Sequence, residues 1–229
     1  MKFFPITVID DFFDDPAAVK NFAESIEYNT PDETNYPGVT SKKQIPELYP
    51  PLADWIQHKL MTIFYHQDSG VGWDVDMDFQ KISPYNFDDQ FHILNRGIPH
   101  IDSTANAVVL AGLIYLNEDP SLDTGTSIFC KKKGCEFYMV PEEVIKFSRK
   151  YHSTSDSTEF IHIAQRHLSM FEETVRIQAK FNRMVVYSAD DYHAQTTYGI
   201  KGGLNRLTLR FFISNIVCSD QSMPLLRKY

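Results

Sequence analysis

Residues 73–82 alternate apolar and polar side chains, and this period of two limits the possible folds more than any other feature. Successive side chains of a β-strand point to opposite faces, so the alternation predicts a strand with one buried face. Further strands are predicted at residues 91–94, 107–117, 125–129, 136–140, 183–188, 192–198 and 206–215. So many short strands are typical of a β-sandwich or a barrel.

The N-terminal third has a helical pattern instead, after a predicted strand and turn at residues 6–13. Asp15 followed by Pro16 is typical of a helix start, and the pattern predicts a helix over residues 17–28. A second helix is predicted over residues 52–65, where apolar residues recur at helical spacing. The sequence therefore predicts a mainly β fold with supporting helices on one side.

No repeat and no low-complexity linker divides the 229 residues, so we expect one domain spanning residues 1–229. Residues 1–70 would be mostly helical support, and residues 73–215 the β core. A segment at about 141–177, helical at its start and polar further on, is interpreted as an insertion between strands. No apolar run has the length of a membrane helix, and the N-terminus lacks the pattern of a signal peptide.

The charge and the cysteines limit the partners and the compartment. A formal net charge of -8 argues against broad electrostatic binding of nucleic acid. The three cysteines, Cys130, Cys135 and Cys218, are too few and odd in number for a disulfide framework. Free thiols in a reducing compartment are the better interpretation, so we expect a cytoplasmic protein.

The strongest candidate for chemistry is His100, with Asp102 two residues later and His193 far downstream. In a strand, residues two apart point to the same side, so His100 and Asp102 could reach one ion. Two imidazoles and one carboxylate can occupy one face of an octahedral iron(II) and leave the other face open. The apolar run after the pair predicts a buried strand that would anchor the site.

A single H-x-D pattern is weak, because His66 and Asp68 have the same spacing. That second pair lies at a predicted helix end and precedes a flexible turn, where a histidine complements the helix dipole. We therefore favour His100 and Asp102, although a histidine of the core or of a hairpin is an open alternative for His100.

A third element lies one strand beyond His193, where Arg206, Thr208 and Arg210 share one strand face. A guanidinium offers a bidentate fork to a carboxylate, and a neighbouring hydroxyl adds a further donor. In isolation, an arginine on a half-exposed strand is more commonly a surface cation. Its position in the order of motifs favours a ligand-binding role.

Taken in order, the segments HID, IYLNEDPSLDTGTSIF, NRMVVYSADDYHA and NRLTLRFF resemble the core of the 2-oxoglutarate and iron(II)-dependent oxygenase superfamily. The resemblance is to its prolyl-hydroxylase-like branch and to uncharacterised relatives, and it covers residues 99–215. It implies a double-stranded β-helix of the jelly-roll type. It further implies His100, Asp102 and His193 as the ligands of Fe(II), and hence as the catalytic centre.

The same resemblance implies that Arg206 binds the distal carboxylate of 2-oxoglutarate, with Thr208 beside it and Tyr115 as a possible further contact. Arg206 follows His193 by thirteen residues, a longer spacing than is common in the family, so Arg210 is a rival. Dioxygen would be the oxidant and ascorbate a supporting reductant. Because halogenating relatives lack the carboxylate, Asp102 predicts hydroxylation of a C–H bond.

The resemblance leaves the substrate open, as an amino acid, a peptidyl residue or another small molecule. Residues 152–171, with His162 and His167, are a candidate lid over the pocket. Two other functions remain as alternatives, a β-helix binding module without catalysis and a viral or structural jelly-roll protein. The sequence does not indicate an oligomeric state.

Overall fold

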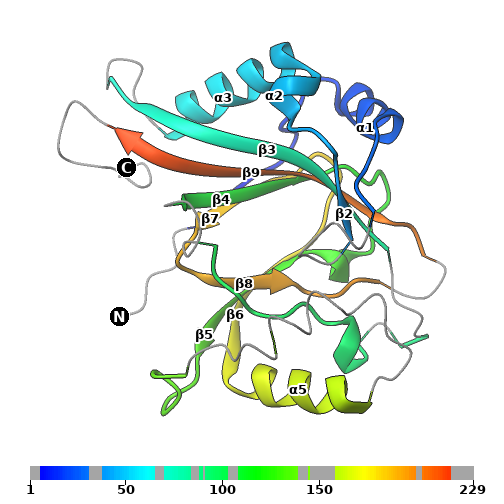
Figure 1. The fold of residues 1–229 in the computed structure, drawn as a ribbon, viewed down its shortest axis with the longest axis vertical. Coiled ribbons are helices and arrows are strands. Elements are labelled where there is room, and N and C mark those ends of the chain that lie inside the picture. Colours follow the sequence, from blue (N-terminus) through cyan, green and yellow to red (C-terminus); the bar gives the residue numbers. More distant parts are fainter. Residues whose placement is uncertain are drawn as a thin grey trace.

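Two facing antiparallel sheets make up most of the protein, seen in the computed structural model of Figure 1. The structure describes residues 6–30, 38–64, 70–83, 88–89, 91–102, 108–138, 144, 158–199 and 203–217. The larger sheet has six strands in the order β1-β7-β4-β9-β3-β2, and the smaller has three in the order β6-β5-β8. The predicted mainly β fold is confirmed.

The larger sheet joins strands from both halves of the sequence. Its strands are β1 (Ile6–Ile9), β2 (Val39–Thr40), β3 (Gly72–Ile82), β4 (Val108–Tyr115), β7 (Met184–Ser188) and β9 (Arg206–Val217). The smaller sheet contains β5 (Thr126–Lys131), β6 (Phe171–Ile177) and β8 (Tyr192–Gln195). Strand β9 lies between β3 and β4, so the last described strand occupies the interior of the larger sheet.

Three N-terminal helices cover the outer face of the larger sheet: α1 (Pro16–Ser25), α2 (Ile45–Leu48) and α3 (Pro50–Phe64). Asp15 caps α1 as predicted, because its carboxylate accepts the N–H of Ala18 at 3.0 Å. Ile56 and Leu60 of α3 are buried in the main hydrophobic core, which forms between these helices and the sheet. No helix of the described residues is long and apolar enough to cross a membrane.

The alternation along β9 separates two environments. Leu207, Leu209 and Phe211 pack in the core beneath the helices. Arg206 and Thr208 are also buried, on the opposite face, which looks toward the smaller sheet. The space between the sheets is therefore lined partly by polar groups, although β9 lies deep in the fold.

Several predicted elements differ in the structure. Residues 91–94 were predicted as a strand, but a turn and the 3-10 helix η2 (Ile93–Asn95) form there, because the His92 ring accepts the N–H of Leu94. Residues 136–138 of the predicted strand 136–140 are not in a strand, and the rest lie outside the described residues. The predicted helix before residue 152 also lies outside them, apart from Val144, which is helical.

The segment predicted as an insertion at about 141–177 contains two described elements. Helix α5 (Thr158–Ser169) packs at the end of the molecule away from α1 to α3. Strand β6 pairs with β5 along its length, so residues 171–177 belong to the smaller sheet and not to an insertion.

Cys130 and Cys135 are free thiols as predicted, and Cys218 lies outside the described residues.

Candidate metal centre

His100 lies beside strand β8, to which an isolated β-bridge with His193 joins it. The N–H of His100 donates to the carbonyl of His193 at 3.1 Å, and the N–H of His193 donates back at 2.9 Å. Three residues earlier, Gly97 donates to the carbonyl of Gln195 at 3.0 Å. The backbone therefore fixes the two histidines opposite each other, although 93 residues separate them in sequence.

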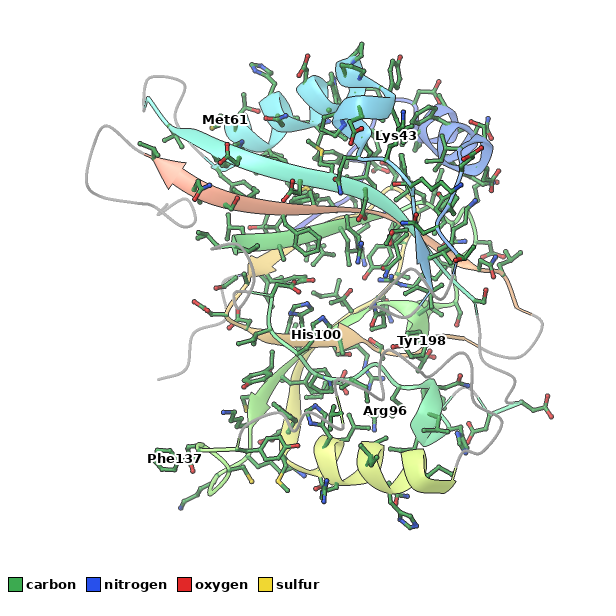
Figure 2. All side chains as sticks on the ribbon, in the orientation of Figure 1. Lys43, Met61, Arg96, His100, Phe137 and Tyr198 are labelled. Carbon is green, nitrogen blue, oxygen red and sulfur yellow. The ribbon has the colours of Figure 1, made fainter. Side chains whose placement is uncertain are left out.

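The side chains of His100, Asp102 and His193 converge in the space between the two sheets, where Figure 2 shows His100 near the middle of the molecule. Nε2 of His193 lies 3.1 Å from Oδ2 of Asp102, and Nε2 of His100 lies 3.8 Å from Oδ1. The possible ligand atoms all lie within 4.8 Å of one another. His193 is 6% exposed and His100 40%, so the cluster is closed on one side and open on the other.

Backbone carbonyls orient both imidazoles. Nδ1 of His100 lies 2.8 Å from the carbonyl oxygen of Ile98, and Nδ1 of His193 lies 3.0 Å from that of Asp191. A carbonyl oxygen can only accept, so each Nδ1 carries a proton and each ring directs its Nε2 toward Asp102. Such Nδ1–H contacts to carbonyls are typical of metal-binding histidines.

Electrostatics keep the carboxylate of Asp102 ionised. Burial opposes ionisation of Asp102, but its hydrogen bond to His193 and the charges of His193, His100 and Arg210 lower its pKa to about 2. Burial and the neighbouring His193 lower the pKa of His100. An ionised carboxylate and the Nε2 atoms of two imidazoles therefore converge on one point. A divalent cation satisfies all three donors at once, so these residues fit a metal ion.

Arg206 forms a second polar site, on the same inner face of β9. Its guanidinium is buried, with Nε donating to the carbonyl of Thr124 at 2.9 Å. Nη1 and Nη2 of Arg206 and Oγ1 of Thr208 have no hydrogen-bond partner among the described residues. A buried charge left without acceptors is costly, so this site fits an anion such as a carboxylate.

Tyr115 borders the same site from β4. Its ring lies under the guanidinium of Arg206, with 5.3 Å from Cζ to the ring centroid. Its hydroxyl is hydrogen-bonded to that of Thr126 on the smaller sheet, at 2.8 Å. Burial raises the pKa of Tyr115, against the opposing charge of Arg206, so the hydroxyl remains protonated at neutral pH.

Arg210 has a different environment from Arg206. It makes a bidentate ion pair with Asp78 of β3, with Nε and Nη2 at 2.9 and 2.7 Å from the two carboxylate oxygens. Of the two arginines, Arg206 is therefore better suited to an added carboxylate. The sequence reasoning missed Asp78, although the alternation of residues 73–82 places it on the polar face.

The sequence also suggested two other groups of histidines. His66 and Asp68 lie outside the described residues. His162 is exposed on α5, whereas His167 is fully buried and both of its ring nitrogens have hydrogen-bond partners. The sequence reasoning also missed Tyr187, whose ring lies 4.4 Å from that of His193 and closes the inner side of the cluster.

Comparison with known proteins identifies a family and a fold. A family model described as "Family of unknown function (DUF6445)" matches residues 3–197. No match to this chain is found among curated proteins.

Solved structures of similar fold include an oxidoreductase of the 2OG-Fe(II) oxygenase family from Burkholderia pseudomallei, 10% identical, with a TM-score of 0.52. The match covers 91% of this chain and 84% of that one. The non-heme alpha ketoglutarate dependent epimerase SnoN from nogalamycin biosynthesis is 11% identical over 91% of this chain and 78% of its own, with a TM-score of 0.51. At such identities the likeness concerns the fold alone, and it confirms the predicted double-stranded β-helix.

Proposed function

This chain belongs to the family of unknown function DUF6445, and we propose that it is a 2-oxoglutarate-dependent oxygenase with non-haem Fe(II). In this proposal it uses dioxygen to hydroxylate a C–H bond of an amino acid, a peptidyl residue or another small molecule. His100, Asp102 and His193 hold the metal. The observation that carries the proposal is that the charges of Asp102 in this donor set and of Arg206, whose Nη groups lack acceptors among the described residues, both act on the buried Tyr187.

The two sites together fit a metal and a dicarboxylate better than either would alone. Three protein ligands leave further positions on an octahedral ion for a bidentate cosubstrate and dioxygen. Arg206 lies four residues before Arg210 on the same strand face, and the charge of Arg210 acts on Asp102. A short dicarboxylate that reaches from the metal toward Arg206 explains why a buried cation is retained without acceptors for its two Nη groups.

Each residue then has a stated task. Arg206 binds and orients the distal carboxylate through Nη1 and Nη2, and Thr208 donates its hydroxyl to the same group. Tyr115 packs against the guanidinium and keeps water from that end of the pocket. With Fe(II) bound there, dioxygen would be the oxidant: one of its oxygen atoms would go to 2-oxoglutarate, which yields succinate and carbon dioxide, and the other to the substrate C–H bond.

The carboxylate of Asp102 bears on which reaction follows. Asp102 supplies a carboxylate at the position where halogenating enzymes of this superfamily leave room for a halide, so we propose oxygen transfer and not halogenation. A binding module would not need the unsatisfied Arg206 and the three converging donors together.

The test combines binding and turnover. The purified chain is titrated with 2-oxoglutarate under anaerobic conditions with and without Fe(II), and succinate release is then measured in air with ascorbate. We expect binding that depends on Fe(II) and succinate release above that of His100→Ala and Asp102→Ala. Absence of both signals in the unsubstituted chain would refute the proposed function.

A further inference from the structure

His167 of α5 is fully buried and lies directly behind the metal-binding segment. Its Nε2 is 3.0 Å from the carbonyl oxygen of Pro99, the residue that precedes His100. Its Nδ1 is 2.9 Å from the hydroxyl of Tyr138. The carbonyl can only accept, so Nε2 of a neutral His167 carries the proton, and Tyr138 must donate its hydroxyl to Nδ1. The two contacts thus define one tautomer.

Apolar packing joins the same helix to the segment on both sides of this hydrogen bond. Ala164 of α5 is buried in a cluster with Leu94, and Ile98 packs against that cluster. Ile98 is also the residue whose carbonyl orients Nδ1 of His100. Helix α5 therefore contacts the residues before His100 in two ways, through apolar side chains and through the hydrogen bond of His167.

The second histidine is supported from the same side. A register shift between Ile128 and Phe129 of β5 places Phe171 of β6 in the cluster that contains Phe129. There the ring of Phe171 lies 5.0 Å from that of His167 and 4.8 Å from that of Tyr192. Tyr192 immediately precedes His193, so the aromatic cluster backs the other half of the site.

We propose that α5 is a buttress of the metal centre, in which His167 is a positioning residue that holds the Pro99 carbonyl and Tyr138 fixes its tautomer. This inference rests on the proposed function and adds to it a role for the segment that the sequence suggested as a lid. A hydrogen bond to the peptide before His100 restricts the rotation of that residue. Groups that orient metal ligands in this way typically change metal affinity by about 10- to 100-fold when they are lost.

The test compares three variants by the affinity of the full chain for Mn²⁺. The affinity is measured from the electron paramagnetic resonance signal of the free ion. His167→Leu removes the donor, and we expect it to weaken Mn²⁺ binding by about tenfold. His167→Gln retains an amide N–H that can reach Pro99, and we expect it to stay within about threefold of the unsubstituted chain. His162→Leu is the matched control, since it is the same change at an exposed position of the same helix.

The inference is wrong if His167→Leu binds Mn²⁺ as tightly as the unsubstituted chain, or if His167→Gln loses as much affinity as His167→Leu. An equal loss in His162→Leu would also contradict it. A nitrogen NMR spectrum of the histidine rings tests the tautomer without any variant at His167. We expect a proton on Nε2 of His167, and in Tyr138→Phe a mixture of tautomers. A proton on Nδ1 in the unsubstituted chain would contradict the inference.

Failure of the proposed function has a different signature. If the proposed function is wrong, the unsubstituted chain will bind Mn²⁺ no more tightly than His100→Ala does. Hydrogen exchange of the His100 amide, which donates to His193, still reports on the buttress in the absence of metal. We expect exchange about tenfold faster in His167→Leu than in His167→Gln, because loss of local contacts lowers the free energy of local opening. Equal rates would overturn the inference by itself.

Discussion

Arg206 and Arg210 lie four residues apart on one strand face, and their surroundings give them opposite properties. Arg210 has both oxygens of Asp78 as acceptors. The Nη groups of Arg206 have none among the described residues. Breaking a buried ion pair is costly, whereas replacing an unsatisfied buried charge by an apolar group is not. The two arginines should therefore separate ligand affinity from stability.

We expect Arg206→Met to raise the Kd for 2-oxoglutarate by about 30-fold or more, because hydrogen bonds to charged groups contribute roughly 1.5–3 kcal/mol. The same change should lower the free energy of unfolding without ligand by less than about 1 kcal/mol. Arg210→Met should do the reverse and cost about 3 kcal/mol of stability, since it leaves Asp78 without its partner. Anaerobic titration and urea unfolding measure the two quantities. A destabilised Arg206→Met with normal affinity would contradict this assignment.

For single residues, the sequence was enough to select the candidate site residues but not to predict which side chains they contact. The spacing of His100 and Asp102 and the order of the motifs were enough to select residues that the fold brings together. Their role as ligands stays a prediction. Nothing in the local pattern could show that Asp78 pairs with Arg210, because 132 residues separate them. The choice between the two arginines depends on that contact.

At the scale of single elements, strands with clean alternation were predictable and interrupted ones were not. Strand β3 alternates from Trp73 to Phe79. Strand β6 has Glu172 and Glu173 near its start and a register shift opposite, which together hide the period of two. Residues 91–94 are apolar apart from His92, whose ring accepts the N–H of Leu94 and caps a 3-10 turn. Such a local side-chain hydrogen bond competes with strand formation, and apolar content does not reveal it.

The close approach of residues 97–100 to strand β8 depends on a glycine. A Cβ at Gly97 would lie 2.3 Å from the carbonyl oxygen and 2.7 Å from the nitrogen of Gln195. We expect Gly97→Ala to lower the free energy of unfolding by about 2 kcal/mol, in the range of overpacked sites, and to weaken metal binding. Gly72→Ala is the control, because its Cβ would meet nothing within 4 Å. Equal urea midpoints for both variants would contradict the predicted clash.

For the whole molecule, buried tyrosines set the response to alkaline pH. Burial raises the pKa of Tyr115, Tyr187 and Tyr198 above the ordinary value. The native state therefore keeps protons that the unfolded state releases above about pH 10, and stability falls as the pH rises beyond that value. Below it, these groups contribute no pH dependence.

We expect tyrosinate absorbance of these residues to appear together with the loss of circular dichroism above about pH 10. Tyr198→Phe should flatten the decline of Tm with pH in this range, because one fewer proton is released on unfolding. Early ionisation of all tyrosines in a chain that keeps its native spectrum would contradict the burial of these hydroxyls.

The position of β9 also bears on how the chain is made. Strands β3 and β4 both pair with β9, so during synthesis on the ribosome the larger sheet lacks an interior strand until residues 206–217 have emerged. Until then two strands expose unpaired edges, which invite wrong pairing with other chains. Contacts between residues so distant in sequence also form slowly. The nascent chain should accordingly depend on chaperones late in synthesis, and cells with few of them should yield mostly aggregated protein.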